Sequence, residues 1–166
     1  MSEVTDTYYA GEAFHGYGSQ LEVGDGASPT EHFAAVADVI SITPGSMDTA
    51  VIEKTHLRSP EAHREKLAGL RDSGPFTITG NWRPLHQSQS NAGGGTSAFA
   101  SGGLVYFWRT RAVKNWKIVL SDGSPATEWP FTGFVSKFQP GEIGTDDKVS
   151  FTAEITPVSD FSADLP

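Results

Sequence analysis

The chain has 166 residues, a length that predicts a single domain with a substantial core. It contains no cysteine, which excludes disulfides, thiolate metal sites and cysteine nucleophiles. Its formal net charge of −8 argues against a broad nucleic-acid-binding surface. The first residues contain no basic segment or apolar run, and no stretch reaches the roughly 18 apolar residues of a membrane span. We therefore expect neither a signal peptide nor a membrane protein.

The charged residues are unevenly distributed along the chain. Residues 1–53 contain nine acidic and no basic side chains, residues 54–121 contain ten basic and three acidic ones, and residues 122–166 contain eight acidic and two basic ones. Surface solubility would explain this pattern, and so would surfaces of opposite sign that meet between neighbouring copies of the chain. The sequence leaves both explanations open.

The chain opens with a segment that lacks periodicity. Residues 1–31 combine Gly, Ser, Asp and Thr with scattered aromatic residues, and we interpret them as an N-terminal arm. Residues 32–42 then predict a first strand, which Thr43-Pro44-Gly45-Ser46 ends, and residues 49–57 predict a second strand.

A helix is predicted next. Ser59 is a candidate N-cap, Pro60 suits the first helical position, and Gly74 is a natural stop. Few large apolar residues lie between these signals, so we expect this helix to flank a sheet. Alternating apolar and polar residues over 75–83 then predict a strand.

The second half of the chain begins with a Gly/Ser-rich stretch over 86–103. It is too long for an ordinary connection, and we expect a flexible loop. Residues 104–114 are ambiguous between strand and helix, and we favour a short helix. Further strands are predicted at 116–120, 128–138 and 148–156, and residues 159–166 form a polar C-terminal tail. The result is a mostly β domain over 32–158 with one or two short helices.

No motif in the sequence carries recognisable chemistry. The five histidines lack HExxH spacing, no G-x-S-x-G is present, and Gly93-Gly94-Gly95-Thr96 lacks the lysine of a phosphate-binding loop. We therefore predict no catalytic residue, no cofactor and no metal. The four tryptophans would serve either as core residues or as a stacking platform for sugars or bases. They are Trp82, Trp108, Trp116 and Trp129.

The C-terminal third contains an ordered series of strand and turn motifs. Trp116-Lys-Ile-Val-Leu-Ser-Asp-Gly123 is followed by Phe131-Thr-Gly-Phe-Val-Ser-Lys-Phe138, and then by a turn and strand over 140–155 that contains Lys-Val-Ser-Phe-Thr-Ala-Glu-Ile. This order resembles the tail tube proteins of long-tailed, non-contractile bacteriophages, the lambda-like group. Leu57-Arg-Ser-Pro-Glu61 resembles the same family. The resemblance covers residues 32 to 158, and the insertion at 87–101 departs from it.

The resemblance implies a β-sandwich or barrel-like tail tube domain with a flanking helix. It implies a structural virion protein that forms hexameric rings, with four strands of each copy lining the bore. Stacked rings would form the tube through which genomic DNA passes. The implied partners are further copies of the chain and the tape measure, tail tip and tail terminator proteins, with assembly in the host cytoplasm before the protein becomes part of the virion.

Two sets of residues follow as candidates for this role. An acidic bore would repel phosphate and let DNA slide. Its candidate lining residues are Asp38, Asp48, Glu53, Glu142 and Glu154. Candidate contacts between rings are Tyr8, Tyr9, Phe14, Asn91 and Phe99.

Two other functions remain open from the residues alone. A carbohydrate- or ligand-binding β-sandwich module would use the tryptophans as its platform. A small hydrolase would bring carboxylates together only in space.

Overall fold

The computed structural model describes residues 16–58, 63–122 and 125–160. All strand pairs in this part of the chain are antiparallel. The strands are β1 Gln20–Gly24, β2 Phe33–Ala35, β3 Val39–Thr43, β4 Met47–Glu53, β5 Lys66–Ser73, β6 Phe76–Asn81, β7 Val113–Leu120, β8 Thr127–Pro140 and β9 Ser150–Pro157. Helix α1 spans Leu104–Thr110, and a 3-10 turn spans Ser97–Phe99.

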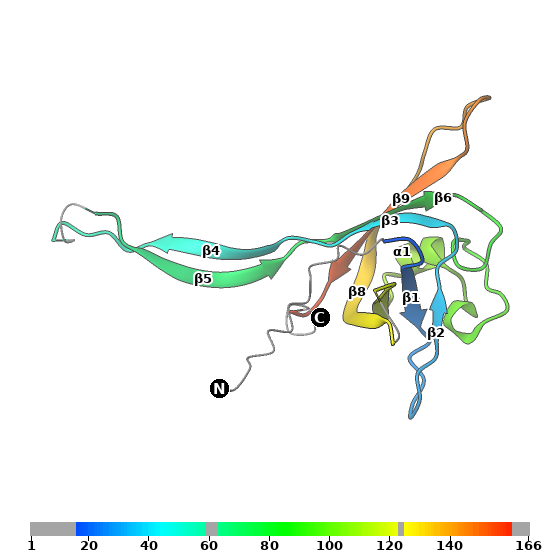
Figure 1. Cartoon of the computed structure of the whole chain (residues 1–166), viewed down its shortest axis with the longest axis horizontal. Helices are drawn as coiled ribbons and strands as arrows, with labels where there is room; N and C mark the ends of the chain where they lie inside the picture. Colours follow the sequence, from blue (N-terminus) through cyan, green and yellow to red (C-terminus); the bar gives the residue numbers. More distant parts are fainter. Residues whose placement is uncertain (1–15, 59–62, 123–124, 161–166) are drawn as a thin grey trace, which may run out of the picture.

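Seven strands form one sheet in the order β2-β1-β7-β8-β9-β6-β3. The sheet curves around one apolar core, with the 14-residue strand β8 at its centre, and within the described residues it does not close into a barrel. β4 and β5 form a separate two-stranded ribbon that projects far from the globular part (Figure 1). The mostly β fold predicted from the sequence is confirmed.

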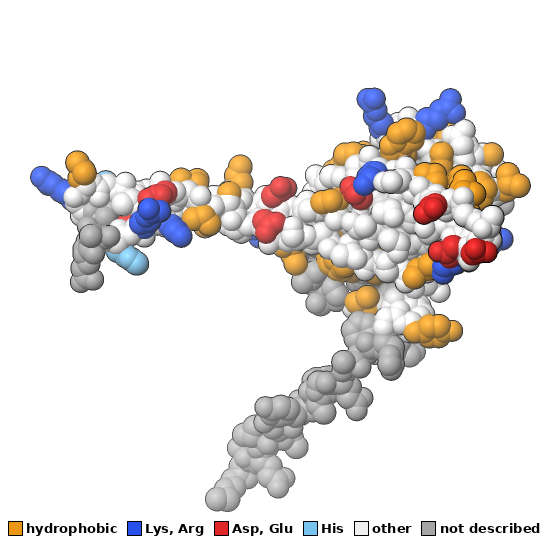
Figure 2. Space-filling model, turned by 90° about the horizontal axis from the view of Figure 1, so that it is seen from above, with side chains coloured by type: hydrophobic (Ala, Val, Ile, Leu, Met, Phe, Trp, Pro, Cys, Tyr) orange, Lys and Arg blue, Asp and Glu red, His pale blue; other side chains and the backbone are white. Residues whose placement is uncertain are grey.

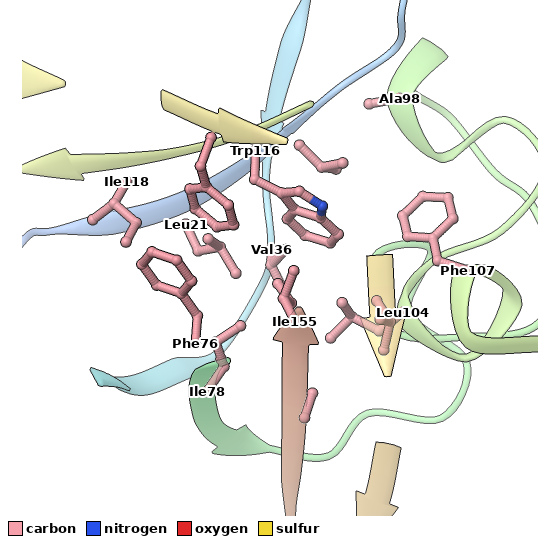
Figure 3. Close-up of a cluster of buried hydrophobic side chains, with 14 of the residues drawn as sticks. Leu21, Val36, Phe76, Ile78, Ala98, Leu104, Phe107, Trp116, Ile118 and Ile155 are labelled. Atoms are coloured by element: carbon pink, nitrogen blue, oxygen red, sulfur yellow. The ribbon is translucent and has the colours of Figure 1, made fainter. Parts of the chain in front are cut away.

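The core follows from strict alternation along the strands. In β9, for example, Phe151, Ala153 and Ile155 are buried while their neighbours lie on the opposite face. Trp116 of β7 sits among these side chains and donates its indole N–H to the Gly133 carbonyl at 3.1 Å. Figure 3 shows aliphatic and aromatic side chains from strands and from α1 converging on one interior. One continuous core therefore holds the sheet and α1 together.

The helix predicted after Ser59 is wrong. Residues 66–73 are strand β5, which pairs with β4 from Met47↔Ser73 to Glu53↔Lys66. Residues 59–62, including the proposed N-cap, lie outside the described residues. The local capping signals compete here with a complete antiparallel ladder, and the ladder satisfies the backbone of both segments.

Residues 1–31 were interpreted as an N-terminal arm, but residues 20–24 of this segment form strand β1 of the sheet. Leu21 and Val23 are fully buried, and β1 pairs with both β2 and β7. A strand of five residues offers too few alternations to stand out from a polar segment. In contrast, the short helix favoured for 104–114 is confirmed over Leu104–Thr110 and buries Leu104 and Phe107.

The Gly/Ser-rich stretch 86–103 is tied to the sheet by a buried polar side chain. Gln89 is fully buried, and its amide donates to the carbonyls of Ala37 (2.8 Å) and Asn81 (3.0 Å) and accepts from the Arg83 N–H (2.7 Å). Phe99 of the same stretch is buried in the core. Gln89 and Phe99 therefore anchor the stretch that the sequence predicts as a flexible loop to the sheet and the core at two points.

Replacing Gln89 should strongly destabilise the subunit. In Gln89→Met the side chain has similar volume, but three partly buried backbone groups lose their partner, so we expect a loss of about 2–3 kcal/mol in unfolding free energy. Urea denaturation of the subunit measures this loss. Gln139→Met is the matched control, because Gln139 is exposed, and it should leave stability within about 0.5 kcal/mol. Equal stability of the two variants would contradict the anchoring role.

Candidate assembly surfaces

The ribbon β4–β5 exposes apolar residues over its whole length. Every residue of β4 is exposed, and Ile52 and Leu70 keep 53% and 86% of their surface accessible. Register and alternation place Ala50, Ile52 and Leu67 on one face of the ribbon. Figure 2 shows hydrophobic side chains at intervals along the ribbon. An isolated two-stranded ribbon is marginally stable in water, so this element needs a covering surface.

The ribbon leaves the sheet at a joint built from two glycines. Gly45 and Gly74 face each other so closely that a Cβ on Gly45 would lie 1.9 Å from the Gly74 carbonyl oxygen. The Gly74 N–H donates to the Ser46 carbonyl at 2.8 Å. Pro44 and Pro75 flank the two glycines and interrupt the ladder between β3–β6 and β4–β5. This joint lets the same two chain segments pass from the sheet into the ribbon.

A polar face covers the opposite side of the sheet from the core across four strands. Its first row runs from Ser41 of β3 through Thr79 and Thr152 to Gln139, and the hydroxyl oxygens of Ser41 and Thr79 are 2.6 Å apart. A second, parallel row crosses the same four strands. It consists of Thr43, Thr77, Glu154 and Lys137. We call these two rows the hydroxyl face.

The hydroxyl face carries balanced charge. Glu154 and Lys137 form an ion pair at 3.2 Å, and the remaining six residues of the two rows are uncharged. Short hydroxyl side chains leave the surface flat, since they reach only about one or two bonds above the backbone. A flat, neutral, hydrophilic surface suits a wall past which a charged polymer moves.

A cluster of charged side chains around Lys117 connects strands β2, β1, β7 and β8 of the sheet. Lys117 of β7 contacts Glu22 of β1 (3.3 Å) and Glu128 of β8 (2.9 Å), and its ammonium lies 4.6 Å from the centre of the Phe33 ring. Burial opposes the charge of Lys117, but hydrogen bonds to Glu128 and Glu22 outweigh that cost and raise its pKa above the ordinary 10.5. Lys117 therefore joins four neighbouring strands.

Removing Lys117 should weaken this half of the sheet. Lys117→Met leaves two carboxylates without their cation, and we expect a loss of about 1–2 kcal/mol in unfolding free energy. Because the folded pKa is raised, the contribution of Lys117 is complete below its ordinary pKa and is lost as pH rises through the folded pKa. Chemical denaturation at neutral and alkaline pH tests both points. Lys148→Met, at an exposed position without an ion pair among the described residues, should behave like the unchanged chain.

Three of the four tryptophans pack inside the subunit. Trp116 and Trp129 are buried core residues, and Trp82 packs against the core while partly buried. Only Trp108, on α1, is exposed among them, with 49% of its surface accessible. The tryptophan platform of the ligand-binding alternative is therefore wrong.

A groove of about 500 Å³ lies where the curved sheet fails to close. It lies between β3, which supplies Val39 and Ile42, and the ends of β7 and β8, which supply Ile118 and Trp129. No charged side chain lines it.

Among the described residues there is no group of three or more potential metal ligands. The longest described helix, α1, has seven residues, far fewer than a membrane-spanning helix needs.

The candidate contacts between rings fall in different environments. Tyr8, Tyr9 and Phe14 lie outside the described residues. Asn91 is exposed, whereas Phe99 retains only 1% of its surface and belongs to the core of its own subunit. The ribbon β4–β5 was missed as a contact element, because the sequence predicts a helix over residues that form β5. The apolar residues of 47–57 and 67–70 are visible in the sequence, but their pairing is not.

The candidate bore acids do not lie on one surface. Asp38 lies in the turn between β2 and β3, where it pairs with Arg83 at 3.3 Å. Asp48 and Glu53 are on the ribbon, and Glu142 is in the turn after β8. Glu154 alone among the five belongs to the hydroxyl face. Alternation along the predicted strand 148–156 already places Glu154 on the face opposite the core, whereas the positions of the other four depend on how the strands are arranged in space.

Comparison with known proteins agrees with this architecture. Residues 17–161 match the family described as "Lambda phage tail tube protein, TTP". The chain belongs to this family. The resemblance stated from the C-terminal motifs is thereby confirmed, as is a structural role as a tail tube component of the virion.

Solved structures share the fold of this tail tube protein at low sequence identity. One is the tail of an empty gene transfer agent particle with C6 symmetry, which has 13% identity and a TM-score of 0.61 over 89% of this chain and 96% of that chain. Another is the sheath–tube complex of an extracellular contractile injection system, PVC, in the extended state, with 13% identity and a TM-score of 0.60 over 95% and 96%. No curated protein matches the chain.

Proposed function

We propose that this tail tube protein assembles into hexameric rings that stack into a tube for DNA passage. The observation that carries the proposal is the ribbon β4–β5, an apolar two-stranded element that nothing in the described part of its own subunit covers. Further copies of the chain supply the cover. The C6 symmetry of the similar gene transfer agent tail supports six copies per ring.

The hydroxyl face lines the bore in this proposal. It crosses four strands, β3, β6, β9 and β8, which equals the number of lining strands expected for each copy. Within its two rows the only cation, Lys137, is already paired with Glu154, so the face offers phosphates no free positive charge. Where the ribbon extends the wall, Asp48 lies opposite Asp72, whereas Glu53 lies opposite Lys66. The net bore charge in this proposal is negative, because Asp48 and Asp72 add to a face whose own two charges cancel.

The remaining partners follow from the same role. Tape measure, tail tip and tail terminator proteins would contact the end rings, and the structures similar in fold include assemblies described as a sheath/tube terminator and a baseplate. Tyr8, Tyr9, Phe14 and Asn91 remain candidates for contacts between rings. The protein acts structurally and not as an enzyme, and it assembles in the host cytoplasm before it enters the virion.

Making the ribbon polar should block assembly without unfolding the subunit. In the double variant Ile52→Ser, Leu70→Ser the core is untouched, because both side chains are exposed in the single copy. We expect the melting temperature of the subunit to stay within a few degrees and rings and tubes to disappear from electron micrographs. Leu85→Ser, at an exposed apolar residue of the globular part, is the matched control and should assemble. Normal tubes from the ribbon variant would exclude the ribbon as an assembly element.

A cation on the hydroxyl face should slow DNA passage. Thr152→Lys places six positive charges in each proposed ring, where they would neutralise DNA phosphates and release counterions. We expect tubes to form and DNA release from particles to slow at low salt, with recovery as salt increases. Thr96→Lys adds the same charge at an exposed position of the stretch 86–103 and serves as the control. Unchanged release by Thr152→Lys at every salt concentration would remove the hydroxyl face from the bore.

A further inference from the structure

A second groove, of about 550 Å³, lies at the end of α1 against β8. Trp108, Arg109 and Arg111 line it from the helix side. Phe134 and Ser136 line it from the strand side. Half of the Trp108 surface is accessible, so the groove combines an exposed aromatic side chain with two guanidinium groups. We call it the basic groove.

The cations of the basic groove have no acidic partner in the described part of the subunit. Among the described residues, no ion pair involves Arg109, Arg111 or the nearby Lys114. Arg111 ends α1 in the left-handed backbone conformation, with φ of 56°. Glycine or asparagine adopts this conformation at a lower energy than arginine does.

The turn between β8 and β9 is complementary to this groove. Over residues 141–149 it carries Glu142, Asp146 and Asp147 against the single cation Lys148, and all four side chains are exposed. Ile143 in the same turn keeps 75% of its surface accessible. The turn therefore offers one exposed apolar side chain and an excess of carboxylates, which match the aromatic and guanidinium groups of the groove.

The groove and the turn of one copy cannot meet. Gly141, at the start of the turn, lies six positions along extended chain from Val135, beside the groove, which corresponds to about 20 Å. The turn projects away from the globular part (Figure 1). Contact therefore requires a second copy. In a head-to-tail arrangement the groove of each copy takes the turn of the next, and the series closes into a ring if the rotation between copies permits it.

We propose that the acidic turn 141–149 of one copy docks into the basic groove of the next. This inference rests on the proposed self-assembly and names one of its contact surfaces. It also favours one of the two explanations of the uneven charge, namely surfaces of opposite sign that meet between neighbouring copies. The cations of residues 54–121 in one copy would contact the acids of residues 122–166 in the next.

Charge reversal with rescue tests the contact in assembly. Arg109→Glu with Arg111→Glu should raise the protein concentration needed for tubes at least about tenfold. Adding Asp146→Lys and Asp147→Lys to the same chain restores opposite charges and should return that concentration to near the original. Arg109→Lys with Arg111→Lys keeps the charge and is the control. Assembly of the reversed variant at the original concentration, or a failure of the fourfold variant to recover, would overturn the inference.

Cross-linking tests the contact independently of tube formation. Because the chain has no cysteine, Ser136→Cys in the groove and Thr145→Cys in the turn each introduce a single thiol. Mixing the two variants under mild oxidation should give at least about fivefold more disulfide dimer than mixing Ser136→Cys with Leu85→Cys. Equal yields from the two mixtures would refute the docking even if tubes form. Selective cross-linking in the absence of tubes would support the docking and refute the proposed tube.

Discussion

The β4–β5 ribbon exposes apolar side chains that no other described part of its subunit covers, and the arrangement of the other elements is best understood from this exposure. Two strands cannot bury an apolar face by themselves, whereas the seven-stranded sheet does so around Trp116 and its neighbours. The joint at Gly45 and Gly74 lets the same two segments serve both purposes, first as strands β3 and β6 of the sheet and then as the ribbon. One chain therefore contains both a packed core and a ribbon whose apolar side chains are exposed.

The two faces of the sheet carry different kinds of side chain. The inner face holds the aromatic and aliphatic core, while the hydroxyl face has short polar side chains and one internal ion pair. Strong fixed charges would either bind DNA or repel neighbouring copies within a Debye length, roughly 8 Å at physiological salt. The cations at the end of α1 belong to neither row of the hydroxyl face and have no ion pair among the described residues, which leaves them available for contacts between copies.

Local sequence signals predicted the elements that the core stabilises. The alternation of β9 and the apolar run of α1 were readable because each buries a face against the core. The helix expected after Ser59 failed because β5 draws its stability from pairing with β4, a segment whose partner is invisible to local patterns. Gln89 was missed because a glutamine within a polar stretch has no signature until three backbone groups surround it.

The sequence by itself determined the absence of thiol chemistry, the mostly β composition, the family through the C-terminal motifs and the uneven charge. These properties depend on residue identity and on neighbours within a strand or turn. Only the tertiary structure decided that Phe99 is a core residue, that Glu154 stands on the hydroxyl face while Asp38 and Glu142 do not, and that β4 and β5 project as a ribbon. The physical reason is that strand order and register are set by contacts between residues far apart in the chain, and a shift of one residue exchanges the two faces of a strand.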